Sequence, residues 1–356
     1  MKNIKIIQLG AKIGSESGMG RGNAGDTAVG AACSNVYQNE FSNCEITYMN
    51  CRQIFEQKHI EEINSKDVLI LSGGGVFLKD TFPNNVSDWQ WGISPELLSK
   101  INIPIIVYGI GYNKFRGQPN FSTLFNESVS TLVEKAVFFS MRNTGSCISI
   151  KKHIPKKLHS KIFMNYCPTI LFKNNFKKNN LRTSTVGFLL AGDRLSNRHK
   201  DLKKFISNIK EFRNYLKNIG VKTILINHQN DNWISEFIKF DEHKDLYKKS
   251  NNEIYNFYSS IDTVIADRGH GQMIPFSCGC KIISPVSHEK LAWFLDDLGL
   301  NDLGINENDE NLGKYLIEKY DLLSTINWGK IYQLKMNQIK ENYDENMKKI
   351  KRELEI

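Results

Sequence analysis

Short apolar runs alternate with longer stretches of helical periodicity along most of this chain. The strands that these runs predict are, in chain order, Ile4–Leu9, Val68–Leu71, Pro104–Tyr108, Phe138–Ser140, Val186–Leu190, Thr223–Asn227, Thr263–Ala266 and Lys281–Ser284. Strands that are separated by helical stretches are typical of a parallel sheet with helices on both faces. The pattern therefore predicts an α/β fold.

Several of the intervening stretches carry helix signals. Helices are predicted to begin near Asp26, to span Lys203–Ile219, to cover Gln272–Ser277 and to begin again near Glu289. From residue 328 onward, apolar residues recur at helical spacing between charged ones, at Ile339, Tyr343, Met347, Ile350 and Leu354. This spacing predicts a C-terminal amphipathic helix, at 329–356, that packs on the body of the protein.

A polar, basic run at Lys173–Thr185 interrupts the alternation near the middle of the chain and is predicted to be a linker. A chain of 356 residues exceeds the size of one ordinary hydrophobic core. We therefore expect two Rossmann-like parallel-sheet domains, at 1–178 and 184–328, that face each other across a cleft.

Composition narrows the class of protein further. The mean hydropathy is −0.38, and no apolar run approaches the roughly 20 residues that span a bilayer. The seven cysteines are scattered and odd in number, which favours reduced thiols. We expect a cytoplasmic protein.

The formal net charge of +9 predicts anionic partners. Because aromatic residues do not interleave with the lysines as a stacking platform requires, we do not expect nucleic acid to be the partner. An anionic small substrate fits the charge, and so does an acceptor at an acidic membrane surface. Peripheral association with the inner membrane surface therefore stays open.

The stretch with the clearest chemistry follows the predicted strand Thr263–Ala266. Arg268 and His270 lie two residues apart in a turn with Gly269 and Gly271, just before a predicted helix. A strand, a glycine turn and a helix place backbone N–H groups and the positive end of the helix where an anion can bind. Arginine binds carboxylate or phosphate through a planar fork, and histidine exchanges a proton near neutral pH.

Other glycine clusters and charged residues also follow predicted strands. Arg142 comes directly after Phe138–Ser140, where its side chain is expected to point into the ligand crevice, although a salt bridge to a helix is a fair alternative. Asp26 either caps a helix or takes part in catalysis. The three glycines Gly73, Gly74 and Gly75 form either a plain turn or a surface against which a substrate lies.

Several familiar sites are absent from the sequence. The glycine clusters match neither a P-loop nor a dinucleotide-binding fingerprint, and no G-x-S-x-G motif is present. Six histidines form no i,i+4 pair with a neighbouring carboxylate, so we expect no metal: they are His153, His159, His199, His228, His243 and His288.

Together, six motifs resemble the polysaccharide pyruvyl transferase family over roughly residues 4–300. They are Gly22-Asn23-Ala24-Gly25-Asp26, Leu71-Ser72-Gly73-Gly74-Gly75, Gly109-Ile110-Gly111, Ser140-Met141-Arg142, Arg268-Gly269-His270-Gly271 and the later Lys290. The resemblance implies a GT-B-like fold and the transfer of pyruvate from phosphoenolpyruvate to a sugar hydroxyl, usually with closure of a cyclic ketal. The chain departs from the family pattern at Gly269, where members usually carry a bulky residue.

The resemblance also implies roles for individual residues. Arg142, Arg268 and His270 would contact the carboxylate and phosphate of the donor, with Lys290 nearby, and His270 would be the general acid or a phosphate ligand. Independently of the resemblance, the chemistry makes Asp26 or Asp193 the candidate to orient or deprotonate the acceptor hydroxyl. The first domain would hold the acceptor, a sugar or glycan precursor of the cell envelope, and the second would hold the donor. The remaining residues expected on the acceptor side or its loops are Asn23, Gly73, Gly74 and Gly75. No cofactor is expected beyond phosphoenolpyruvate as co-substrate.

Two other functions remain open at this stage. A GT-B glycosyltransferase that uses a nucleotide-activated sugar would need an acidic residue for the ribose, and Glu289 could serve. A non-catalytic glycan-binding protein could also keep the fold. The sequence does not indicate the oligomeric state.

Overall fold

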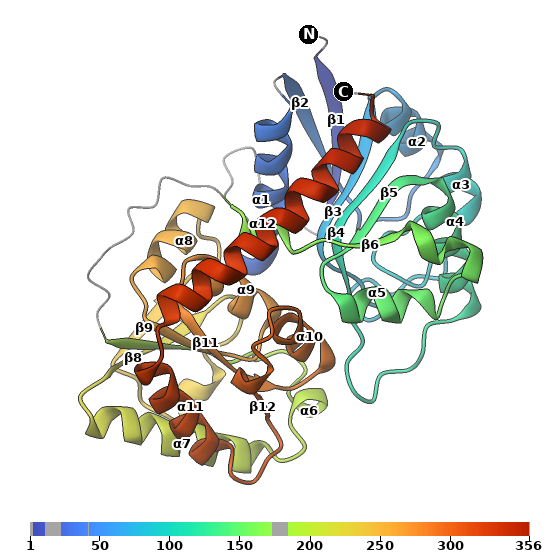
Figure 1. Cartoon of the computed structure of the whole chain (residues 1–356). Coiled ribbons are helices and arrows are strands. Elements are labelled where there is room, and N and C mark those ends of the chain that lie inside the picture. Colours follow the sequence, from blue (N-terminus) through green and yellow to red (C-terminus); the bar gives the residue numbers. More distant parts are fainter. Residues whose placement is uncertain (1–2, 11–22, 42, 173–183, 356) are drawn as a thin grey trace.

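The structure, a computed structural model, describes residues 3–10, 23–41, 43–172 and 184–355 and folds into two lobes (Figure 1). Each lobe is built on a six-stranded sheet whose neighbouring strands run parallel. The first sheet has the strand order β2-β1-β3-β4-β5-β6, and the second has the order β12-β11-β10-β7-β8-β9. The predicted pair of parallel α/β domains is confirmed.

The first sheet takes its strands from the first half of the chain. They are β1 (Ile4–Gly10), β2 (Cys44–Asn50), β3 (Val68–Phe77), β4 (Ile105–Tyr112), β5 (Ala136–Met141) and β6 (Ile162–Met164). The second sheet follows residue 184. Its strands are β7 (Thr185–Leu189), β8 (Lys222–Asn227), β9 (Glu242–Asp245), β10 (Thr263–Ala266), β11 (Lys281–Val286) and β12 (Gly304–Asn306).

Helices connect the strands in each lobe. Those of the first half are α1 (Ala24–Glu40), α2 (Gln57–Asn64), α3 (Pro95–Ser99), α4 (Thr123–Lys135), α5 (Thr144–Lys151), η1 (Lys156–Lys161) and η2 (Pro168–Ile170). Those of the second half are α6 (Leu195–Arg198), α7 (Leu202–Asn218), η3 (Trp233–Glu236), α8 (Asn251–Ser259), α9 (Gly269–Ser277), α10 (Glu289–Asp297), η4 (Asn301–Leu303), α11 (Leu312–Thr325) and α12 (Trp328–Glu353).

All eight predicted strands exist, and two of them extend well beyond the glycines that were predicted to end them. The sequence predicted that glycine clusters end the strands at Leu71 and Tyr108, whereas β3 and β4 continue through the glycines. The cause is close packing: a Cβ on Gly73 would lie 2.6 Å from the Val29 side chain of α1, and Gly74 has a φ of +93°. The glycines let the strands continue beneath a helix instead of ending them.

The sequence also missed four strands, β2, β6, β9 and β12, and each of them is the edge of a sheet. Edge strands bury fewer side chains, so they lack the continuous apolar run that marks a central strand. The four residues of β9, for example, contain three that are exposed.

Each sheet has one point at which the chain reverses its direction of strand addition. In the first sheet this point lies between β1 and β3, and in the second it lies between β7 and β10. Ligands of open parallel sheets bind beyond the carboxyl ends of the strands at such a switch point. The turns after β1, β7 and β10 are therefore the places where a site is expected.

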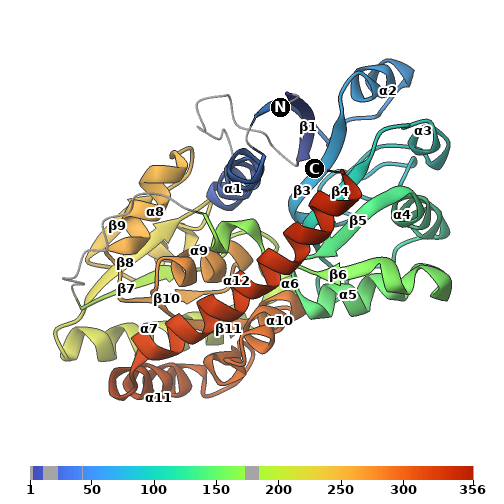
Figure 2. The same ribbon diagram turned by 45° about the horizontal axis from the view of Figure 1, so that its top comes forward.

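Helix α12 joins the two lobes and runs diagonally from one to the other (Figures 1 and 2). Its Trp328 and Ile339 belong to the core of the second lobe, and its Met347 and Ile350 belong to a core of the first. Near its end, Tyr343 Oη donates a hydrogen bond to Glu40 of α1 at 2.7 Å.

One sequence prediction, the linker at Lys173–Thr185, lies largely outside the described residues. Among the described helices, none has the length and apolar character needed to cross a membrane. The seven cysteines, all within the described part, are free.

Candidate active site

A cleft of about 510 Å³ opens between the carboxyl ends of the two sheets and takes residues from both lobes. Its walls carry six cationic side chains and two carboxylates. The lining residues are Asn23, Asp26, Arg52, Gly75, Leu78, Thr81, Gln90, Asn113, Phe115 and Arg142 from the first lobe, and Gly192, Asp193, Arg194, Arg198, His228, Gln229, Asn230, Arg268, Gly269, His270 and Lys290 from the second.

Arg142 enters the cleft from the end of β5. The Asn143 side chain caps α5 by accepting a hydrogen bond from the Ser146 N–H at 2.7 Å, so the chain turns sharply at this point. Gly111 of β4 makes room for the guanidinium, because a Cβ there would clash with it. Arg142 is 3% exposed, and its Nε has no hydrogen-bond partner among the described residues. Burial lowers the pKa of Arg142 below its ordinary value.

Lys290 enters the same cleft from the first turn of α10, which the extended residue His288 precedes. Its Nζ lies 5.3 Å from the centre of the Phe115 ring, which the first lobe contributes. Burial, together with the positive charges of Arg142 and Arg198, lowers the pKa of Lys290 well below its ordinary value. A Cβ on Gly269 would lie 3.7 Å from the Lys290 Cε, so a bulky residue at 269 would compete with Lys290 for space.

Arg268, at the N-cap of α9, has carboxylate partners. Its Nη2 lies 2.6 Å from Asp231 Oδ1 and 2.8 Å from Asp193 Oδ1, and its Nε also donates to Asp231. Although burial alone would lower the pKa of Arg268, the Asp231 and Asp193 charges outweigh burial and raise it. In the part of the chain that the structure describes, neither Arg142 nor Lys290 has such an ion-pair partner. Among the described residues, the cleft thus contains two basic side chains that form no ion pair with a carboxylate.

Asp193 lies in contact with three arginines. It pairs with Arg194 at 2.5 Å, with Arg268 at 2.8 Å and with Arg198 at 3.3 Å. Burial would raise the pKa of Asp193, but the charges of Arg268, Arg198 and Arg194 outweigh burial and hold it well below its usual range. Such a carboxylate is a weak base, so its contacts fit the positioning of arginines better than deprotonation of an acceptor hydroxyl.

His270 lies in the first turn of α9, where the two lobes meet. Its Nε2 is 3.7 Å from Cys167 Sγ, and a Cβ on Gly25 of α1 would lie 2.5 Å from its Nδ1. Burial raises the pKa of Cys167, so that residue is a thiol, and the Thr169 hydroxyl donates to its sulfur at 3.2 Å. Burial and the charges of Arg142 and Lys290 lower the pKa of His270 well below its ordinary value, so the ring is neutral at pH 7 in the absence of an anion.

The two residues at the start of α1 differ from the sequence expectation. The helix is capped by Asn23, whose side chain accepts a hydrogen bond from Gly25 N at 2.7 Å, and not by Asp26. Asp26 lies in the first turn instead, 3.9 Å from Arg52 Nη2 and on the wall of the cleft. Its carboxylate is thereby left partly exposed to a ligand.

The three consecutive glycines of β3 have different surroundings. Gly75 lines the cleft, where its carbonyl accepts a hydrogen bond from Gln90 Nε2 at 3.0 Å. Gly73 lies against Val29 of α1, and neither Gly73 nor Gly74 is among the lining residues. Close helix packing accounts for these two.

Sequence reasoning missed three residues that shape the cleft. Asp231 is fully buried and holds Arg268 in place. Arg198 donates a hydrogen bond to the Asp267 carbonyl at 3.1 Å. The Arg194 guanidinium lies 4.8 Å from the centre of the Phe115 ring. Asp231 follows strand β8 closely, so its position after a strand is the signal that could have found it. Arg198 lies at the end of the short helix α6 and carries no such signal. Phe115 comes from a loop and carries no such signal.

Glu289, the acidic residue that a nucleotide-sugar site would use, lies elsewhere. Its side chain is about half exposed and pairs with Arg116 at 3.1 Å, and it is not among the residues that line the cleft.

One group of side chains in the described residues has the spacing of metal ligands, namely His199, Asp267 and Glu307. It is buried and separate from the cleft lining.

Comparison with known proteins links the chain to one family. Residues 23–289 match the profile of the family described as polysaccharide pyruvyl transferase, and no curated protein matches the sequence. The solved structures with a similar fold include a putative UDP-N-acetylglucosamine 2-epimerase from Listeria monocytogenes, at a TM-score of 0.57 and 12% identity over 93% of this chain and 91% of that one. The UDP-GlcNAc 2-epimerase from Methanocaldococcus jannaschii has a TM-score of 0.55 at 14% identity, with 91% and 94% covered. At such identities the likeness shows the fold alone, which is the GT-B-like arrangement of UDP-sugar enzymes.

Proposed function

Because the chain belongs to the polysaccharide pyruvyl transferase family, we propose that it transfers pyruvate from phosphoenolpyruvate to a sugar hydroxyl and closes a ketal. The acceptor in this proposal is a sugar of a cell-surface polysaccharide or glycolipid precursor. The reaction takes place in the cytoplasm, and the enzyme associates peripherally with the membrane when its acceptor carries a lipid.

The unbalanced cations support this donor most directly. Arg142 comes from the first lobe and Lys290 from the second, both line one cleft, and neither has a carboxylate partner among the described residues. A buried charge without a partner is unfavourable, so a site that keeps two of them is suited to a ligand that brings the missing negative charge. Phosphoenolpyruvate has a carboxylate and a phosphate a few atoms apart, which matches two cations on facing walls.

Two further features suit the same ligand. The start of α9 at Gly269 directs backbone N–H groups and the positive end of the helix dipole into the cleft, which favours an anion. Arg268 is held in place by Asp231, so its guanidinium is oriented before the ligand arrives.

The chemistry consists of proton transfers and C–O bond changes. A proton is added to the methylene carbon of phosphoenolpyruvate, which leaves an oxocarbenium-like centre at C2. A sugar hydroxyl attacks C2 and loses its proton, the C2–O bond to phosphate breaks, and inorganic phosphate departs with the bonding electrons. A second hydroxyl of the sugar then attacks C2, loses its proton and closes the ketal.

The geometry suggests which residues perform these steps. His270 lines the same cleft as the two cations, whose charges act on it, and once an anion raises its pKa it can deliver the proton to the methylene carbon or hold the phosphate. Asp26 is the carboxylate of the cleft that has the weakest ion pair, so it is the candidate to accept the proton of the acceptor hydroxyl.

Ligand binding tests the donor. Phosphoenolpyruvate is expected to raise the melting temperature of the protein, and UDP-N-acetylglucosamine is not. Arg142→Gln and Lys290→Gln are expected to weaken phosphoenolpyruvate binding by roughly 10- to 100-fold each, the loss of one charge-assisted contact. Because neither residue has an ion-pair partner among the described residues, neither change is expected to lower the melting temperature of the free protein.

Lys340→Gln is the matched control, since Lys340 is exposed on α12 and lies away from the cleft. This variant is expected to bind phosphoenolpyruvate like the parent. Arg268→Ala is a poorer probe, because it leaves the buried Asp231 unpaired. A melting-temperature rise with the UDP-sugar and none with phosphoenolpyruvate would support a glycosyltransferase or epimerase instead.

A further inference from the structure

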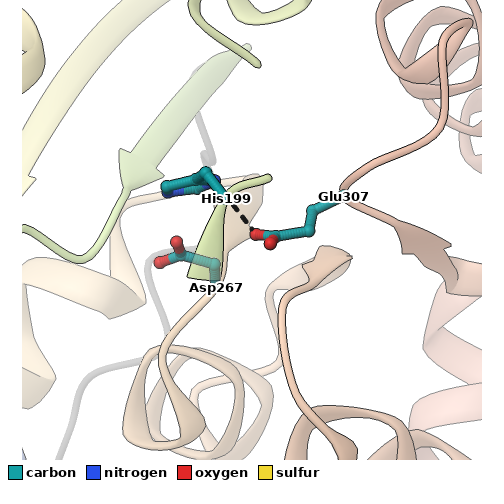
Figure 3. Close-up of side chains that lie close together, drawn as sticks. All are labelled: His199, Asp267 and Glu307. Atoms are coloured by element: carbon teal, nitrogen blue, oxygen red, sulfur yellow. Dashed lines mark ion pairs between the residues drawn. The ribbon is translucent and has the colours of Figure 1, made fainter. Parts of the chain in front are cut away.

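Three side chains from separate segments of the second lobe lie close together outside the cleft lining. His199 follows the short helix α6, Asp267 follows β10 and Glu307 follows β12. Their ligand atoms, one from each residue, all lie within 4.8 Å of one another (Figure 3). Figure 3 shows the His199 ring facing the Glu307 carboxylate, with Asp267 beside the ring.

All three residues are inaccessible to solvent, with exposed fractions of 5% for His199, 0% for Asp267 and 2% for Glu307. His199 Nδ1 lies 3.2 Å from Glu307 Oε2, which is an ion-pair distance when the imidazole is protonated. Among the described residues, both nitrogens of His199, Oδ2 of Asp267 and Oε2 of Glu307 are buried without a hydrogen-bond partner.

The remaining oxygens are used to hold the carboxylates in place. Asp267 Oδ1 accepts a hydrogen bond from Ala191 N at 2.6 Å, and Glu307 Oε1 accepts one from Asn308 Nδ2 at 3.3 Å. The His199 ring packs against Phe205 with 4.1 Å between the ring centres. Each carboxylate is therefore held by one oxygen, and its other oxygen has no hydrogen-bond partner among the described residues. An outer hydrogen bond that orients a ligand is usual at metal sites.

The balance of charge in the cluster also favours a bound cation. Arg198, the nearest arginine, donates to the backbone carbonyl of Asp267 and to Ser287 and not to either free carboxylate oxygen. Two buried carboxylates with unpartnered oxygens are unfavourable unless positive charge lies between them. A protonated His199 would balance one of them, whereas a divalent cation balances both.

We propose that His199, Asp267 and Glu307 bind one first-row divalent cation of the Zn²⁺, Mn²⁺ or Fe²⁺ class. One imidazole and two carboxylates suit these ions better than Mg²⁺ or Ca²⁺, which prefer oxygen ligands alone. Ligands about 2.1 Å from such an ion are about 3.4 Å from each other at tetrahedral angles, close to the 3.2 Å between His199 and Glu307.

The cation would have a structural role, since it would bind residues adjacent in sequence to two arginines of the cleft. Asp267 immediately precedes Arg268, and His199 immediately follows Arg198. The proposal does not depend on the donor, because it concerns occupancy of a site outside the cleft.

Metal analysis of the full chain tests it. Protein expressed in medium supplemented with Zn²⁺, Mn²⁺ and Fe²⁺ is expected to contain one cation per chain. Protein that is unfolded with a chelator and refolded with Co²⁺ is expected to show visible d–d absorption and a higher melting temperature than protein refolded without it.

Glu307→Gln and Asp267→Asn preserve the shape of the side chains and are expected to lower metal affinity by roughly 10- to 100-fold or more. His153→Gln is the control, because His153 is a half-buried histidine of the first lobe that bonds to Tyr112 and Asn126. This variant is expected to keep its metal.

Two results would overturn the proposal. The first is metal-poor protein that, after refolding with Co²⁺, shows no d–d bands. The second is metal content that Glu307→Gln and Asp267→Asn leave unchanged, which would place the cation elsewhere. Both readouts are independent of transferase activity, so they distinguish this proposal from the proposed function.

Discussion

At the scale of single residues, the cleft holds cations in two different states. Arg268 is bound by Asp231 and Asp193, so its charge is balanced before any ligand arrives. Arg142 and Lys290 lack such partners among the described residues, and burial lowers the pKa of both. The first state fixes geometry, and the second provides the electrostatic attraction for an anion.

These pKa shifts predict that donor binding takes up protons. Without a ligand, His270 and Lys290 have pKa values well below their ordinary ones, so they release protons easily. A bound phosphate and carboxylate would raise both values. Groups whose pKa rises on binding favour binding fully below their free-state pKa and cease to do so as the pH rises through the bound-state pKa. Affinity for phosphoenolpyruvate is therefore expected to fall as the pH rises.

Isothermal titration calorimetry at pH 8, in buffers that differ in ionisation enthalpy, measures this uptake directly. Lys290→Met is expected to take up fewer protons than the parent, whereas Lys340→Met is expected to take up as many. Proton release, or binding without any proton exchange, would show that the two groups do not face the ligand.

At the scale of elements, α1 contributes side chains to the hydrophobic cores of both lobes. Its Ala24 and Ala28 pack into a core of the second lobe, while Cys33, Val36 and Tyr37 belong to a core of the first. The small residues at its start let it approach α9 closely, so α1 determines where the His270 ring can lie.

Two glycines of α1 allow a matched test of this contact. A Cβ on Gly25 would lie 2.5 Å from His270 Nδ1, whereas one on Gly30 would meet nothing within 4 Å. Gly25→Ala is expected to displace His270 and to lower the rate of phosphate release from phosphoenolpyruvate at least tenfold. Gly30→Ala is expected to retain the rate and to stabilise the protein by about 0.5–1 kcal/mol, because alanine loses less backbone entropy in a helix.

The contact between α1 and His270 is tested by measuring the rate of phosphate release and the melting temperature of the two variants. Equal rates for Gly25→Ala and the parent would show that the His270 ring can move without loss of function.

At the scale of the whole molecule, α12 couples the lobes. It contributes Ile339 to the second core and Ile350 to the first, and its Lys351 pairs with Glu40 of α1 at 2.8 Å. The arginine Arg194 adds a second link across the cleft, with Nε 2.7 Å from Asp80. Because both the helix and this ion pair join the lobes, the two lobes are expected to unfold together.

Isoleucine truncations on α12 test this coupling by calorimetry. Ile339→Ala and Ile350→Ala each remove a fully buried side chain and are expected to lower the free energy of unfolding by roughly 2–5 kcal/mol. Both are expected to shift one shared transition, although the residues lie in different cores. Leu334 is 56% exposed on the same helix, so Leu334→Ala is expected to change stability by less than about 0.5 kcal/mol. Two separate transitions, each affected by one variant, would contradict the coupling.

The sequence was informative wherever a strand lies inside a sheet. Thr263–Ala266 was predicted with its observed bounds, because a central parallel strand is buried on both faces and reads as a continuous apolar run. The edge strands and the glycine-containing ends of β3 and β4 were missed, because edge strands carry no such run and glycine gives no periodic signal.

The sequence by itself determined that Arg142, Arg268, His270 and Lys290 lie at the carboxyl ends of parallel strands, because alternation of strands and helices places every such turn at one edge of its sheet. Only the tertiary structure decided that the two edges face each other and that His199, Asp267 and Glu307 meet. It also decided that, among the described residues, Arg268 has carboxylate partners while Arg142 and Lys290 have none. Pairing of charges depends on distances between residues far apart in the chain, and local periodicity contains no information about such distances.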